Sequence, residues 1–147
     1  MKIAISSDEY CELVDVLQLE CQKRGHVVFY HGPRKGDTAA DWPAVTAEAA
    51  RQVQSGEADE AIVLCYTGTG ASIAANKLRG IRAALCIDPE TAKGARIWNH
   101  ANVLALSTRL ITPVRAREIL DAWFDTAKST DEWNRRQLAR LAELEDR

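Results

Sequence analysis

The stretch IVLCYTGTGASIAANK, residues 62–77, joins an apolar run to a helical pattern through a turn rich in glycine and threonine. The apolar run ends at Cys65, and Gly68 and Gly70 permit backbone angles that other residues avoid. Such a turn suits four purposes. It can hold a phosphate, carry a nucleophilic thiol, carry an acid–base thiol, or only turn the chain tightly.

Apolar runs and helical patterns alternate along the rest of the chain. The patterns predict strands at 2–6, 26–31, 60–65, 81–87 and 102–107, and helices at 9–25, 43–55, 71–79, 89–99 and 113–127. This alternation indicates an α/β fold with one doubly wound, five-stranded parallel sheet, Rossmann-like and three-layered. The run at 60–65 is the most apolar and is expected at the centre of the sheet. Residues 1–147 are expected to form a single domain, with Asp41 capping its second helix.

A last helical pattern, at about 131–145, follows the polar joint KSTDE. It has apolar positions at 133, 138, 141 and 144, with Arg135, Arg136 and Arg140 between them. One interpretation is a solvated helix packed on its own domain. Because five helices already flank the predicted sheet, we favour a C-terminal arm that is exchanged at a dimer interface.

Composition excludes several classes of protein. The chain has 147 residues, 46% hydrophobic and 27% charged, with a net charge of −2. This charge gives no electrostatic case for nucleic acid or an anionic membrane, and no apolar run is long enough to span one. The start, MKIAISSDEY, lacks the apolar stretch of a signal peptide, so a cytoplasmic protein is expected. The four cysteines show no CxxC spacing and predict reduced thiols without a metal site.

Ligands of doubly wound sheets bind beyond the carboxyl ends of the strands. Asp8, Cys65, Thr67 and Arg109 follow such ends and are expected to share one crevice. The glycine turn lacks the Gly-Lys-Ser/Thr of a Walker A loop, and it follows the third strand rather than the first. Its backbone N–H groups, at residues 67–71, suit an anion or a developing oxyanion.

Cys65 is the reactive candidate among the thiols. It ends a strand just before a helix, where the helix dipole favours a thiolate, whereas Cys21 and Cys86 are expected in the core. A nucleophilic thiol usually needs a partner base, and no histidine is paired with Cys65 by local sequence. A base that moves a carbon-bound proton needs only a suitable pKa and an anion hole.

The segment LCYTGTGASIAANKLRGIRAAL, residues 64–85, resembles the signature of the ribose-5-phosphate isomerase type B family, which includes the galactose-6-phosphate isomerase subunits. KIAISSDEY (2–10), DWPAVTAEAARQVQSGEADEAI (41–62) and NHANVLALSTRL (99–110) are similar to other segments of that family. The resemblance implies aldose–ketose isomerisation of a small phosphorylated sugar through a cis-enediolate, with no metal or organic cofactor. It also implies dimers or tetramers whose sites are shared between subunits.

The resemblance also implies residue roles. Cys65 corresponds to the base that moves a proton between C1 and C2, Thr67 to a ring-opening or oxygen-contacting residue, and Asp8 to a contact of the sugar hydroxyls. Asn99 corresponds to a residue that reaches the neighbouring subunit's site, and Arg109 lies on the phosphate side. The anion hole corresponds to the backbone of Thr67, Gly68, Thr69, Gly70 and Ala71.

The chain departs from the family pattern at the substrate end. Glu9 replaces a histidine, Trp98 the ring-opening histidine, and Tyr66 a glycine; Trp133 and Gln137 stand where two arginines clamp phosphate, with Arg136 beside them. All six are expected to contact substrate. Trp98 and Trp133 either stack on a sugar face or pack a subunit interface. An open-chain tetrulose phosphate would need no ring-opening group.

Three functions are therefore weighed. The first is an aldose–ketose isomerase that uses Cys65 as its base. The second is a non-catalytic sugar-binding protein or subunit that is active only with a partner chain, because the C-terminal pattern also resembles the B-type subunit of galactose-6-phosphate isomerase. The third is a thiol redox or nucleophilic enzyme, for which no second cysteine lies near Cys65 in sequence.

Overall fold

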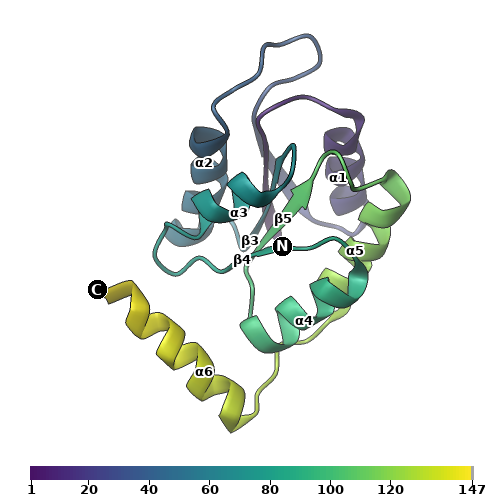
Figure 1. The fold of residues 1–147 in the computed structure, drawn as a ribbon. Helices are drawn as coiled ribbons and strands as arrows, with labels where there is room; N and C mark the ends of the chain where they lie inside the picture. Colours follow the sequence, from purple (N-terminus) through teal and green to yellow (C-terminus); the bar gives the residue numbers. More distant parts are fainter. Residues whose placement is uncertain (147) are drawn as a thin grey trace.

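The computed structural model describes residues 1–146 and contains a five-stranded parallel sheet in the order β2-β1-β3-β5-β4 (Figure 1). The α/β prediction and the central place of β3 are confirmed. The strands are β1 (Lys2–Ser7), β2 (Val27–His31), β3 (Glu60–Cys65), β4 (Ala83–Leu85) and β5 (Val103–Ser107). The helices are α1 (Glu12–Lys23), α2 (Trp42–Ser55), α3 (Thr69–Ala75), α4 (Pro89–Asn99), α5 (Pro113–Asp125) and α6 (Glu132–Glu143), followed by a 3-10 turn, η1 (Leu144–Asp146).

Helices cover both faces of the sheet, as a doubly wound fold requires. Helices α1, α4 and α5 cover one face, and α2 and α3 cover the other (Figure 1). Since successive strand residues point to opposite faces, Leu64 belongs to the first core and Cys65 to the second. The second core consists largely of alanine and valine, so α3 packs close to the sheet and to the end of β3.

Two predicted elements are shorter in the structure, where hydrogen bonds from neighbouring segments limit them, and one predicted cap differs. The helix predicted at 71–79 begins at Thr69 and ends at Ala75, where the Asn76 side chain bonds the N–H and the carbonyl of Ala83. The strand predicted at 81–87 shortens to Ala83–Leu85, because the N–H of Arg82 donates to a side chain. The predicted Asp41 cap is wrong at the side chain, since only the Asp41 carbonyl accepts helix N–H groups.

The predicted C-terminal helix is confirmed as α6, and it lies away from the sheet (Figure 1). Asp131 caps it by accepting the N–H of Asn134 at 2.8 Å. Asn134 is the buried residue of this helix, whereas Leu141 and Leu144 are 43% and 56% exposed. The exchange of α6 between subunits stays a prediction. These exposed leucines are apolar side chains that a second subunit could cover.

A buried carboxylate ties α1 to α5. Glu20 accepts hydrogen bonds from Arg24 at 2.8 Å, Arg117 at 3.1 Å and Lys23 at 3.2 Å. Bonds from Arg24 and Arg117 lower the pKa of Glu20 to about 2. The ionised carboxylate therefore contributes to the stability of the folded state.

Replacing Glu20 is expected to change the acid limb of the stability curve. A carboxylate whose pKa is lowered from 4.5 to about 2 stabilises the folded state above pH 4.5, and this contribution is lost as pH falls toward 2. Glu20→Gln should lower the melting temperature at pH 7 and flatten its fall between pH 4.5 and 2. Glu118→Gln, at an exposed ion pair of α5, is the control. Identical acid limbs for the wild type and Glu20→Gln would contradict the assignment.

Candidate active site

The register of the strands brings the predicted reactive residues to one edge of the sheet. Ser7 pairs with Leu64, and Cys65 pairs with Ser107. Asp8 follows Ser7, Thr67 follows Cys65, and Arg109 follows Ser107 by two residues. All four therefore lie at the carboxyl edge of the sheet, where parallel strands gather their loops.

The β3–α3 turn rests directly on β5. Gly68 has φ of +76°, and a Cβ atom there would lie 2.9 Å from the Leu106 carbonyl carbon and 2.6 Å from Leu85 Cδ1. The N–H of Gly68 donates to the carbonyl of Cys65 at 3.2 Å. Both the backbone angle and the available space therefore require glycine at this position.

The sulfur of Cys65 faces the backbone of this turn. Cys65 is 6% exposed, and its Sγ accepts the N–H of Ala71 at 3.4 Å. This bond orients the sulfur toward the first turn of α3. Burial raises the pKa of Cys21 and Cys86 to about 12, so these thiols remain protonated, in agreement with their predicted core role.

Two hydroxyl groups lie above the same turn. The side chains of Thr67 and Thr69 are exposed, and their Oγ1 atoms are 2.7 Å apart. The N–H groups of Thr69 and Gly70 belong to the first turn of α3, where no helical carbonyl precedes them. Of the other three residues predicted for the anion hole, Gly68 and Ala71 already donate their N–H groups to Cys65.

The loop after β5 is fixed to the turn by backbone bonds. Thr108 N–H donates to the Cys65 carbonyl at 3.1 Å, and Arg109 N–H donates to the Tyr66 carbonyl at 3.2 Å. Ser107 Oγ donates to the same Tyr66 carbonyl at 2.8 Å. These bonds hold Arg109 beside the turn and leave the Tyr66 side chain 65% exposed.

Asp8 and Glu9 border the turn from the side of β1. Burial raises the pKa of Asp8, and the neighbouring charge of Glu9 raises it further, while backbone hydrogen bonds oppose the shift. The Asp8 carbonyl accepts the N–H of Ala40 at 2.8 Å, which fixes the β2–α2 loop here. Asp8 is therefore a half-buried carboxyl group suited to exchanging protons.

The remaining predicted residues lie at the opposite, amino edge. Helix α4 runs back from the carboxyl end of β4 and ends with Trp98 and Asn99 just before β5 begins. Helix α6 follows that same edge, since Asn134 bonds the Ile97 carbonyl and Glu145 bonds the N–H of Gly80. The chain does not place these predicted residues at its own Cys65. They are Trp98 and Asn99 at the end of α4, and Trp133, Arg136 and Gln137 on α6.

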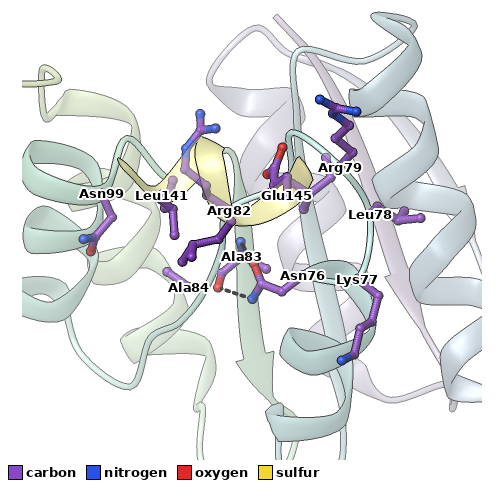
Figure 2. A pocket seen from close by; sticks show the side chains of 13 residues that line it. Asn76, Lys77, Leu78, Arg79, Arg82, Ala83, Ala84, Asn99, Leu141 and Glu145 are labelled. Atoms are coloured by element: carbon purple, nitrogen blue, oxygen red, sulfur yellow. Dashed lines mark hydrogen bonds between the residues drawn. The ribbon is translucent and has the colours of Figure 1, made fainter. Parts of the chain in front are cut away.

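A cavity of about 790 Å³ separates α6 from the body of the chain (Figure 2). Its lining includes Asn99, Arg82 and Lys77 from the body, and Leu141 and Glu145 from the C-terminal segment. Figure 2 shows these side chains around the open space, with Asn76 bonded to Ala83 at its floor. The cavity therefore lies at the amino edge of the sheet, where Asn99 is part of its lining.

Sequence reasoning missed Trp42. A Cβ atom on Gly70 would lie 3.2 Å from the Trp42 ring, so this indole covers the turn that carries Cys65. The ring is 42% exposed at the start of α2. The signal was a tryptophan immediately before Pro43, at a helix start that faces the carboxyl edge.

Among residues 1–146, no group of three or more His, Cys, Asp or Glu side chains is arranged to hold a metal ion. Within that same range, every helix is too short or too polar to cross a bilayer. The groups that gather at the carboxyl edge are a thiol, hydroxyls, a carboxyl group and backbone N–H donors. This set suits proton transfer at carbon.

The fold and the edge chemistry define an α/β isomerase, and comparisons with known proteins agree. A family model described as Ribose/Galactose Isomerase matches residues 3–143. The D-erythrulose-4-phosphate isomerase of Pectobacterium atrosepticum is 36% identical over 85% of this chain and 83% of that protein. The ribose-5-phosphate isomerase B of Escherichia coli is 45% identical over 56% of each chain.

A solved structure of Clostridium thermocellum ribose-5-phosphate isomerase B superposes with a TM-score of 0.92. It is 37% identical and covers 99% of this chain and 98% of that one. The chain belongs to the ribose/galactose isomerase family, as its sequence predicted. It is an isomerase of the aldose–ketose type.

Gly68→Ala is expected to destabilise the fold more than Gly56→Ala. Both glycines have positive φ, but a Cβ at Gly56 meets nothing within 4 Å. The left-handed angle alone should cost about 1–2 kcal/mol at Gly56. Overpacking against β5 should add about 1–3 kcal/mol at Gly68. Urea denaturation measures both variants, and equal losses would show that the turn does not press on Leu106.

Proposed function

We propose that this protein interconverts the aldose and ketose forms of a short phosphorylated sugar, with Cys65 as the base. The observation that carries the proposal is the Cys65 sulfur, buried at the end of β3 and accepting the Ala71 N–H at 3.4 Å. The backbone donor holds the sulfur in one orientation, and a base that removes a carbon-bound proton needs such a fixed position.

The reaction begins when the Cys65 thiolate removes the hydrogen on C2 of the aldose. The electron pair of the broken C–H bond forms the C1–C2 double bond, and the C1 carbonyl oxygen becomes the oxyanion of a cis-enediolate. The N–H groups of Thr69 and Gly70, with the hydroxyl groups of Thr67 and Thr69, are placed to stabilise this oxyanion.

The second half of the reaction returns the proton to carbon. Asp8, whose pKa is raised by burial, carries the O2 proton to O1, so that O2 becomes the new carbonyl oxygen. The Cys65 thiol then gives its proton to C1 and is restored as a thiolate. The sequence of steps conserves protons and needs no redox partner.

The charges and aromatic rings around the edge favour a short, open-chain substrate. Arg109 supplies one cation, while the exposed Glu9 disfavours a phosphate beside it. Trp98 replaces the ring-opening histidine that the family pattern contains, and an open chain needs no such group. We therefore propose a four-carbon sugar phosphate, which also agrees with the erythrulose 4-phosphate isomerase among the relatives.

The residues that contact the end of the sugar far from Cys65 are proposed to come from a second copy of the chain. Trp98 and Trp133 are each 62% exposed, and Asn99 lines the cavity beneath α6. In a two-fold dimer, the amino edge of each copy meets the carboxyl edge of its partner, which places Asn99, Arg136 and Gln137 over the partner's Cys65. The same contact would cover the exposed leucines of α6.

Residues 1–147 are proposed to act as a single isomerase domain in the cytoplasm. Every helix from α1 to α5 packs on the one sheet. The cysteines at positions 11, 21, 65 and 86 are all free thiols, which suits a reducing compartment. The competing function is a sugar-binding subunit that needs a partner chain for activity. An activity assay of the protein alone distinguishes the two functions.

Cys65→Ser is expected to lower isomerisation of D-erythrulose 4-phosphate by at least about 100-fold, because a general base contributes that much or more. Exchange of the transferred hydrogen with deuterated water should fall in parallel, while the sugar phosphate still raises the melting temperature. Cys11→Ser, at a half-exposed thiol that the proposed mechanism does not use, is the control. Wild-type binding without any turnover across a panel of sugars and their phosphates would instead favour the sugar-binding subunit.

Mixing two inactive variants tests the shared site. Cys65→Ala and Asn99→Ala remove groups that the proposed dimer places in one site from different subunits. After unfolding and refolding together in equal amounts, half of the dimers should be mixed, each with one intact site. Activity should recover to about one quarter of the wild-type value. No recovery, with mixed dimers demonstrated by mass spectrometry, would refute subunit sharing.

A further inference from the structure

The two segments assigned to the neighbouring site are joined to each other inside one chain. Trp98 and Asn99 end α4, whereas Trp133, Arg136 and Gln137 belong to α6, with β5 and α5 between them in sequence. The two segments meet at the carbonyl of Ile97. That carbonyl accepts the N–H of Ser129 at 3.1 Å and the Asn134 Nδ2 amide at 3.2 Å.

Asn134 supplies the contact from α6. It is 2% exposed, and it is the buried side chain of a helix whose other described residues are exposed or half-exposed. Its own N–H is held by the Asp131 cap at 2.8 Å. Polar bonds, rather than apolar packing, therefore fix where α6 starts relative to the end of α4.

His100 supplies the contact from the end of α4. Its ring Nε2 lies 2.9 Å from the Ser129 carbonyl, to which it donates, and 3.4 Å from Asn134 Nδ2. The His100 carbonyl accepts two bonds from the Arg82 guanidinium, each at 3.1 Å. These partners hold His100 at φ of +47°, a left-handed angle that costs a non-glycine residue about 1–2 kcal/mol.

We infer that His100 and Asn134 are positioning residues for the distal end of the sugar. They hold Trp98 and Asn99 at a fixed separation from Trp133 and Gln137, so that both segments meet one substrate in the partner's site. Each residue acts through its neighbour in sequence and does not itself touch the sugar. The inference rests on the proposed function, because it assumes the shared site.

Asn134→Leu and His100→Gly test the inference. The first variant keeps the branched shape of the side chain and removes its polar atoms, and the second removes the ring while relieving the left-handed backbone. The protein has four tryptophans, so labelling with 5-fluorotryptophan gives a fluorine NMR signal for each. In both variants the signals of Trp98 and Trp133 should shift together, and that of Trp42 should stay in place. Movement of neither signal, or of Trp133 alone, would overturn the coupling.

Kinetics with D-erythrulose 4-phosphate supply the functional readout. Losing a buried hydrogen bond should raise KM about tenfold with kcat changed less than about threefold, because the Cys65 end is untouched. Arg140→Ala, at an exposed position on the same helix, should match the wild type. Unchanged KM in an active, dimeric Asn134→Leu would overturn the positioning role. Absence of turnover in the wild type would count against the proposed function, while the fluorine signals would still decide whether the segments are coupled.

Discussion

The contact between the β3–α3 turn and the backbone of β5 is the constraint on which the candidate site depends. Gly68 lies so close to Leu106 that no side chain fits, and the carbonyls of Cys65 and Tyr66 accept N–H groups from the loop after β5. Because the turn and the loop share these bonds, neither can move alone. Cys65 therefore faces the Ala71 N–H in a rigid frame, which is what proton transfer at a fixed carbon requires.

The direction of the strands imposes a second constraint. A doubly wound parallel sheet collects its β–α loops at one edge and the ends of its helices at the other. Asp8, Cys65 and Arg109 lie at the first edge, whereas Asn99 lies at the second, at the rim of an open cavity (Figure 2). A single chain of this topology keeps the two sets of residues at opposite edges of its sheet. The exposed tryptophans and the buried polar contact at Asn134 agree with the proposed sharing of a site between two copies.

In the structure, residues 64–85, which resemble the family signature, fall into two parts with different contacts. The first part, from Cys65 to Ala71, forms the turn with the thiol. The second part serves folding, because Asn76 bonds the backbone of Ala83 and Arg82 bonds the carbonyl of His100. Sequence similarity alone weighs these positions equally. The distinction arises from contacts between residues that are far apart in the chain, which no local pattern encodes.

By itself, the sequence determined the order of strands and helices, the central place of β3 and the family, because hydrophobic periodicity and a contiguous motif are local properties. It also singled out Cys65 from the other thiols by its place at a strand end. Only the tertiary structure decided where α3 and β4 stop, that Trp42 covers the turn, and that α6 is fixed by Asn134 rather than by its leucines. These features depend on hydrogen bonds and contacts between distant segments, which exist only once the chain has folded.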